Sequence, residues 1–173
     1  MSKLIAITGT HGTGKTTLSF ILAAEYKKLG ANVKIIQEVA RSCPFPLNEN
    51  MTKETALWIF HEHSKKELEA IRNHDIVICD RTSFDSFVYA AHLEIPMDIY
   101  LIEWAHSHLY EYDTLFYVKP SEKPPLNDGT RSIDLQFQSQ IDTEFKRYLS
   151  GIDLEKIDSS LIFKEDYKWN MYL

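Results

Sequence analysis

Directly after a short apolar run near the amino terminus, the chain reads Gly9-Thr10-His11-Gly12-Thr13-Gly14-Lys15-Thr16. This octapeptide satisfies the pattern Gly-x-x-x-x-Gly-Lys-Ser/Thr, in which a glycine-rich loop joins a strand to the start of a helix. Both flanks agree with that context, because residues 4–7 are apolar and residues 15–29 carry leucine and isoleucine at helical spacing. The sequence therefore predicts a phosphate-binding loop.

Each residue type in the loop has a physical task in holding a triphosphate. Glycine lets the backbone wrap closely, so that amides and the helix amino terminus point at phosphate oxygens. Lys15 is predicted to reach the β and γ phosphates, Thr16 to offer a hydroxyl to Mg²⁺, and Thr17 to bond a phosphate nearer the nucleoside. We expect ATP and Mg²⁺ as cofactors, with nucleotide contacts from Gly9, Thr10, His11, Gly12, Thr13, Gly14, Lys15, Thr16 and Thr17.

Apolar runs alternate with helical patterns along all 173 residues, which is typical of a parallel sheet covered by helices. The prediction is one α/β domain, residues 1–173, with three layers and a five-stranded parallel sheet. Strands are expected at 4–8, 33–37, 76–79, 115–118 and 154–157, and helices at 15–29, 52–73, 83–93, 97–110 and 133–149. In the helix at 52–73, the residues with the spacing of a buried face are Leu57, Phe60, Leu68 and Ile71.

Composition limits the classes of function. With 19 basic and 25 acidic residues the formal charge is -6, so the chain lacks the positive field that attracts nucleic acid or anionic membranes. No stretch has the length of a signal-peptide core or a membrane span. Cys43 and Cys79 suit no disulfide framework, and His61 and His63 lie on nearly opposite sides of a helix, unlike a zinc pair. We expect a cytoplasmic protein without a membrane partner, as a monomer or a homodimer.

The dipeptide Asp80-Arg81 ends the third expected strand. Because that strand should lie beside the loop, Asp80 is predicted to hold Mg²⁺ or its waters, and Arg81 to reach phosphate oxygens. Asp85, one turn later, is either a helix-end charge or a residue of the substrate pocket. The plain alternative for the pair is a surface ion pair or a turn that caps the next helix.

Glu38 ends the second expected strand, and Arg41 follows three residues later. A carboxylate aimed into the cleft would accept a proton from an attacking hydroxyl or bind the sugar of an acceptor. Arg41 would hold a phosphate of the acceptor or of the donor. Trp58 lies off the expected buried stripe and either stacks on an aromatic acceptor or belongs to the core. The alternative for Glu38 is a strand-end carboxylate that points to water, and the alternative for Arg41 is a solvated loop cation.

Residues 119–132 form a segment with prolines and a glycine after the fourth expected strand, and they contain Asp128-Gly129-Thr130-Arg131. A lid hinged here would bring Arg131 to the transferring phosphoryl group and exclude water. The alternative is an exposed turn that uses Asp128 and Gly129 for their backbone angles.

These motifs resemble the P-loop nucleoside and nucleotide kinases, particularly an AAA-domain branch with relatives of the ribosylnicotinamide kinase domain. The likeness spans residues 3–149 and rests on 9–17, on 37–41, on Asp80-Arg81 with Asp85, and on 128–131. It implies the sheet order 2-3-1-4-5 and a lid after strand four. Glu38 resembles the acidic residue after strand two of deoxynucleoside kinases, although Val39 stands where those enzymes usually carry proline.

The resemblance implies an ATP-dependent phosphotransferase that acts on a hydroxyl or phosphate of a nucleoside- or nucleotide-like acceptor. A second hypothesis is a viral-type DNA kinase that phosphorylates 5-hydroxymethyluracil in DNA, which would need a local basic groove, with Lys65, Lys66 and Arg72 as its candidates. A third hypothesis, of another class, is a regulatory NTPase whose output is a conformational change.

Overall fold

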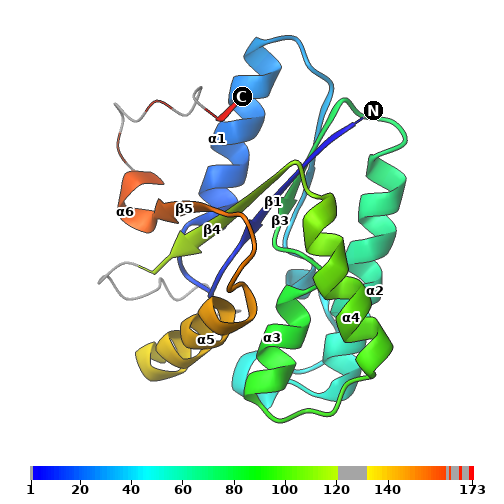
Figure 1. Cartoon of the computed structure of the whole chain (residues 1–173), viewed down its shortest axis with the longest axis vertical. Coiled ribbons are helices and arrows are strands. Elements are labelled where there is room, and N and C mark those ends of the chain that lie inside the picture. Colours follow the sequence, from blue (N-terminus) through cyan, green and yellow to red (C-terminus); the bar gives the residue numbers. More distant parts are fainter. Residues whose placement is uncertain (1, 121–131, 163, 165–167, 169–171) are drawn as a thin grey trace.

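Five parallel strands form one sheet in the order β2-β3-β1-β4-β5 (Figure 1). In this computed structural model the described residues are 2–120, 132–162, 164, 168 and 172–173. The strands are β1 (Lys3–Thr8), β2 (Val33–Ile36), β3 (Ile76–Asp80), β4 (Thr114–Lys119) and β5 (Glu155–Asp158). The predicted fold class and the strand order implied by the resemblance are both confirmed.

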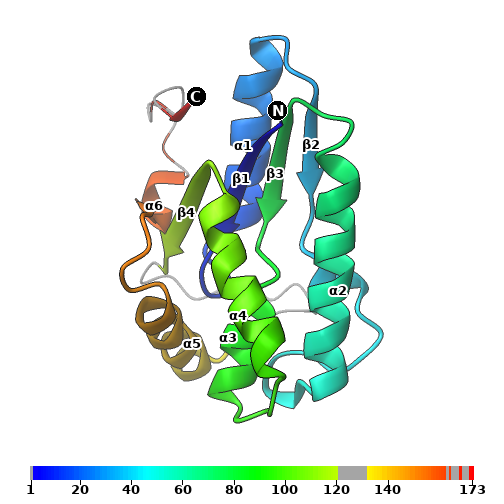
Figure 2. The same ribbon diagram turned by 45° about the vertical axis from the view of Figure 1, so that its right-hand side comes forward.

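Helices cover both faces of the sheet, and Figure 2 shows α4 in front of it and α1 behind it. Their bounds are α1 (Lys15–Lys28), α2 (Lys53–Ala70), α3 (Asp85–His92), α4 (Ile99–His108), α5 (Leu135–Tyr148) and α6 (Ser159–Ile162). Short 3-10 helices are η1 (Val39–Ser42), η2 (Asn48–Asn50) and η3 (Leu109–Glu111). The strands alternate between the two faces: Leu4 and Ala6 pack toward α2–α5, whereas Ile5 and Ile7 pack toward α1.

The face that α2 buries differs from the prediction. Phe60 is buried as expected, but Leu68 is 58% exposed and Ile71 is 37% exposed. The buried residues of α2 are Thr55, Ala56, Phe60, His63, Glu67 and Ala70. Hydrophobic spacing misassigned this face because His63 and Glu67 have polar partners inside the fold, which offset the cost of burying them.

The carboxyl ends of β1, β2 and β3 lie at one edge of the sheet, because β3 pairs in parallel with both of the other strands. β1 leads into the glycine-rich loop, β2 into Glu38, and β3 ends at Asp80. Three segments that are distant in sequence therefore meet at this edge.

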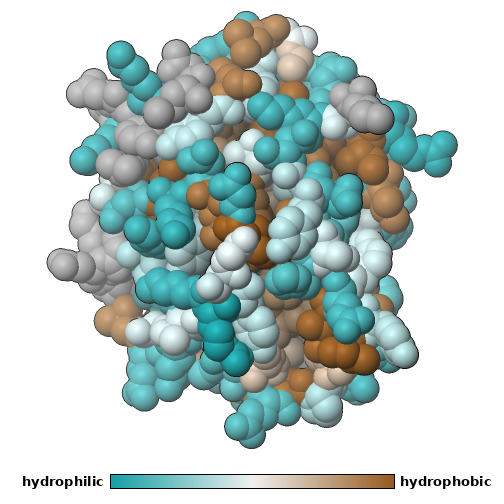
Figure 3. Space-filling view, viewed as in Figure 1, coloured by the Kyte–Doolittle hydropathy of each residue, from teal (hydrophilic) through white to brown (hydrophobic). Residues whose placement is uncertain are grey.

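The surface drawn in Figure 3 is mostly hydrophilic, with separate hydrophobic patches. Among the helices of the described chain, none combines the length and apolarity needed to cross a membrane.

Candidate active site

The glycine-rich loop joins β1 to α1, and its conformation requires glycine. Gly9 has φ 126° and Gly14 has φ 87°, both in the region that L side chains rarely adopt. A Cβ atom on Gly9 would also lie 2.7 Å from the carbonyl oxygen of Val118. Position 9 therefore excludes other residues both by backbone angle and by space.

The side chain of Lys15 folds back over this loop. Its ammonium is buried and donates to the carbonyl oxygen of Thr10 and, at 3.3 Å, to Thr13 Oγ1. Burial, aided by the nearby charge of Arg81, lowers the pKa of Lys15 to about 7. The loop thus holds Lys15 in a place that disfavours its charge until an anion compensates it.

We expect nucleotide binding above pH 7 to take up a proton. A triphosphate beside Lys15 would raise its pKa back toward the ordinary value of 10.5, so an amine that is mostly neutral at about pH 8 becomes charged. Uptake should approach about one proton per nucleotide there and fall toward zero below about pH 6. Isothermal titration in buffers of different ionisation enthalpy measures it, and the same uptake in Lys15→Met would contradict the assignment.

A hydroxyl and a carboxylate meet below the loop. Thr16 Oγ1 donates to Asp80 Oδ2 at 2.5 Å, and Asp80 is buried. Burial raises the pKa of Asp80, partly offset by the hydrogen bond from Thr16. Hard oxygen ligands beside phosphates suit Mg²⁺, which would also favour the ionised carboxylate. Thr16 and Asp80 therefore fit the predicted magnesium site, in a cavity whose wall also contains Lys15, Glu38 and Arg81.

Removing the Thr16 hydroxyl should weaken the use of magnesium. We expect Thr16→Ala to raise the Mg²⁺ concentration that gives half-maximal activity by about tenfold or more, the scale on which lost metal-site contacts act. Nucleotide affinity measured without metal should change little. Thr143→Ala is the matched control, since this threonine is exposed on α5. An unchanged Mg²⁺ requirement in Thr16→Ala would exclude the hydroxyl as a ligand.

Glu38 and Arg81 form an ion pair at the edge of the sheet. Arg81 Nε donates to Glu38 Oε1 at 2.5 Å, and another guanidinium nitrogen lies 3.2 Å from the carbonyl oxygen of Gly9. Burial raises the pKa of Glu38, but the charges of Arg81 and Lys15 outweigh it and lower that pKa to about 2. Glu38 is therefore ionised at neutral pH and can only accept hydrogen bonds.

The backbone of Arg81 has φ 86°, an unusual conformation for a residue other than glycine. Its amide donates to the carbonyl oxygen of Ile7 at 2.9 Å, and its guanidinium contacts Asp85 Oδ2 at 3.4 Å. Such strain persists where surrounding contacts determine the conformation, and it is concentrated at functional sites. The fold thus directs the Arg81 side chain toward the loop.

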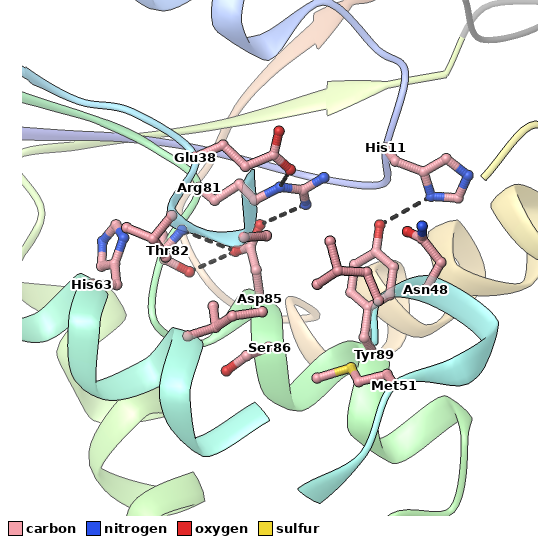
Figure 4. Close-up of a pocket in the computed structure, with 14 residues that line it drawn as sticks. His11, Glu38, Asn48, Met51, His63, Arg81, Thr82, Asp85, Ser86 and Tyr89 are labelled. Carbon is pink, nitrogen blue, oxygen red and sulfur yellow. Dashed lines mark hydrogen bonds and ion pairs between the residues drawn. The ribbon is translucent and has the colours of Figure 1, made fainter. Parts of the chain in front are cut away.

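A second cavity adjoins the ion pair (Figure 4). Asp85 is buried there at the start of α3 and accepts hydrogen bonds from Thr8 Oγ1 at 2.8 Å and Thr82 Oγ1 at 2.6 Å. Asp85 is therefore both a helix-start residue and a pocket residue. The cavity is lined by His11, Glu38, Val39, Ala40, Leu47, Asn48, Met51, Ile59, His63, Arg81, Thr82, Asp85, Ser86 and Tyr89.

Some predicted substrate residues lie outside this lining. Arg41 contacts Glu38 Oε2 at 3.3 Å but lines the neighbouring groove. Within the described chain, α2 lines the cavity with Ile59 and His63 and not with Trp58. Arg131 and the rest of 128–131 lie outside the described residues, so the lid stays a prediction.

Tyr89 lines the second cavity but was not among the site residues predicted from the sequence. Its hydroxyl lies 3.0 Å from His11 Nδ1, and its ring lies under the Arg81 guanidinium, 5.7 Å from Cζ to the ring centroid. Tyr89 thus joins the loop to the second cavity. Its position one helical turn after Asp85 was the signal available in the sequence.

A family model described as AAA domain matches residues 4–164. The chain belongs to this AAA-domain family. The structure of deoxyadenosine kinase from M. mycoides with bound dATP matches with a TM-score of 0.61 and 18% identity, over 91% of this chain and 91% of that one. The same enzyme with dCMP and a flexible dCDP gives a TM-score of 0.58 at 18% identity, over 91% and 90%.

No curated protein matches the chain. The family match confirms the AAA-domain branch of the resemblance, and the solved structures confirm the fold that the resemblance implies.

Proposed function

We propose that this chain is an ATP- and Mg²⁺-dependent kinase that transfers the γ-phosphoryl group to a hydroxyl of a nucleoside-like acceptor. One observation carries the proposal: Glu38 and Arg81 line both the cavity at the glycine-rich loop and the second cavity. Phosphoryl transfer requires the γ-phosphate and the attacking oxygen to meet in line, and this ion pair is where the two cavities adjoin. A nucleotide-driven switch has no need of the second cavity.

The proposed role of each residue follows from its charge. Lys15 and Arg81 neutralise the charge that spreads over the transferring phosphoryl group, while Thr16 and Asp80 would hold Mg²⁺. When bound, Mg²⁺ would supply positive charge that offsets the charge of the phosphates. Glu38 orients the acceptor hydroxyl and accepts its proton. Arg131, delivered by a closing lid, would add a further positive charge.

Charge in the second cavity favours an uncharged acceptor. Its described lining contains the carboxylates of Glu38 and Asp85 and one guanidinium, that of Arg81, which already contacts both. A phosphate on the acceptor would lie near two carboxylates without a cation of its own. A nucleoside hydroxyl is therefore preferred to a nucleoside monophosphate, and the fold shared with deoxyadenosine kinase supports a nucleoside class.

The test is transfer from γ-labelled ATP to a panel of nucleosides, deoxynucleosides, their monophosphates, ribosylnicotinamide and DNA containing 5-hydroxymethyluracil. We expect transfer to at least one uncharged nucleoside, with the matching monophosphate a poorer acceptor. Transfer to the DNA alone, quenched by moderate salt, would establish the DNA kinase instead. Slow hydrolysis without any acceptor, stimulated by a protein partner, would establish the regulatory NTPase.

A further inference from the structure

A second group of chemically reactive side chains lies between α2, β3 and α4. It consists of His63 and Glu67 from α2, Cys79 from β3 and His108 from α4, here called the Glu67 cluster. His63, Glu67 and Cys79 are buried, with exposures of 1%, 3% and 0%. No step of the proposed phosphoryl transfer uses Glu67, Cys79 or His108.

The spacing of these groups suits a tetrahedral metal ion. Glu67 Oε2 lies 3.5 Å from His63 Nε2 and 3.4 Å from Cys79 Sγ, and the three ligand atoms all lie within 4.8 Å of one another. Zinc bonds of about 2.0–2.3 Å at tetrahedral angles separate neighbouring ligand atoms by roughly 3.3–3.7 Å. His108 Nε2 contacts the other carboxylate oxygen of Glu67 and orients this carboxylate from α4.

One atom of the cluster points to a missing ligand. His63 Nε2 is fully buried and, among the described residues, has no partner with hydrogen-bond geometry. Its contact with Glu67 Oε2, at 3.5 Å, is an ion-pair distance only. An imidazole nitrogen buried without a hydrogen bond is costly, and a metal ion would remove that cost. The Tyr112 hydroxyl donates to Glu67 Oε2 at 2.7 Å, as outer-shell groups do when they orient a ligating carboxylate.

We propose that the Glu67 cluster binds one Zn²⁺ through His63 Nε2, Glu67 Oε2 and the Cys79 thiolate, with His108 holding the Glu67 carboxylate in place. Imidazole and thiolate ligands select zinc over magnesium, so this site and the Thr16–Asp80 site take different metals. Binding displaces the thiol proton of Cys79 to solvent, because zinc is held by the thiolate. A surface hollow lined by Glu67, His108 and Trp104 gives the ion a path of entry.

The site would join three elements that support the catalytic edge. Cys79 directly precedes Asp80, and His63 also lines the second cavity (Figure 4). A zinc ion held between α2, β3 and α4 therefore fixes the wall of the second cavity against β3, the strand that carries Asp80. Its role is structural, because it joins α2 to β3 while His108 from α4 orients the carboxylate ligand.

The test uses the full chain, loaded with Co²⁺ in place of Zn²⁺ and followed by absorption, with zinc content measured by mass spectrometry. We expect one metal ion per chain and a thiolate-to-cobalt charge-transfer band. Cys79→Ser should abolish the band, and His63→Gln should weaken metal affinity by about tenfold or more. Cys43→Ser and His61→Gln are matched controls, because Cys43 lies outside the cluster and His61 is exposed on the same helix.

Absence of the cobalt band in the wild-type protein, or its persistence in Cys79→Ser, would overturn the proposal and leave the cluster as a hydrogen-bond network. The wild-type spectrum decides the question even where a buried variant fails to fold. Circular dichroism and ATP binding identify such a failure, and they separate loss of zinc from loss of the nucleotide site.

Discussion

Replacement of Lys15 by alanine is expected to lower kcat/KM by on the order of a hundredfold or more, the scale on which one preorganised charge-stabilising group acts. Lys15 is buried against Thr10 and Thr13 of the loop, where water screens its charge little. Its ammonium therefore interacts strongly with charge on the transferring phosphoryl group. Steady-state kinetics with the acceptor identified from the panel measure the loss.

Lys27→Ala is the control for Lys15→Ala, because Lys27 is exposed in the last turn of the same helix. We expect its kinetics to match those of the unchanged protein. If Lys15→Ala kept the turnover and the ATP–Mg²⁺ affinity of the wild type, the glycine-rich loop would have no role in the reaction.

Replacement of Glu38 by glutamine is expected to lower kcat by about 10²- to 10⁴-fold, the range for loss of a general base. Glutamine keeps the shape of the side chain and leaves Arg81 its contacts with Gly9 and Asp85, but it cannot take a proton from the acceptor hydroxyl. Affinity for ATP–Mg²⁺ without acceptor should change far less. Comparison of kcat with calorimetric nucleotide affinity separates the two effects.

Glu25→Gln is the matched control for Glu38→Gln, since Glu25 pairs with Lys28 on the surface of α1. A kcat within about threefold of the wild type in Glu38→Gln, well below the general-base range, would make Glu38 a partner of Arg81 and not the base.

The sequence predicted the parts of this molecule that local pattern determines. The glycine-rich loop carries its own signature, and the apolar strands β1 and β3 fix the parallel sheet around it. Asp80 and Glu38 could be predicted at one edge because parallel strands end there together. Their direct partners, Thr16 for Asp80 and Arg81 for Glu38, required the structure.

The predictions failed where burial depends on tertiary partners. Hydrophobic spacing assigned Leu68 and Ile71 to the inner face of α2, but this face carries His63 and Glu67. Glu67 is stabilised there by Tyr112, 45 positions away in the sequence, and no local pattern indicates such a contact. The same buried face of α2 brings His63, and not Trp58, to the second cavity.

The central claim is that donor phosphates and acceptor meet at the Glu38–Arg81 pair. The most direct measurement is the affinity of a bisubstrate ligand, in which adenosine and the best acceptor of the panel are joined through a phosphate chain. If the two cavities adjoin there, both halves bind at once, and affinity should exceed that of ATP by about 10²- to 10⁴-fold, with competition against both substrates. An affinity no greater than that of ATP, or competition with ATP alone, would contradict the account.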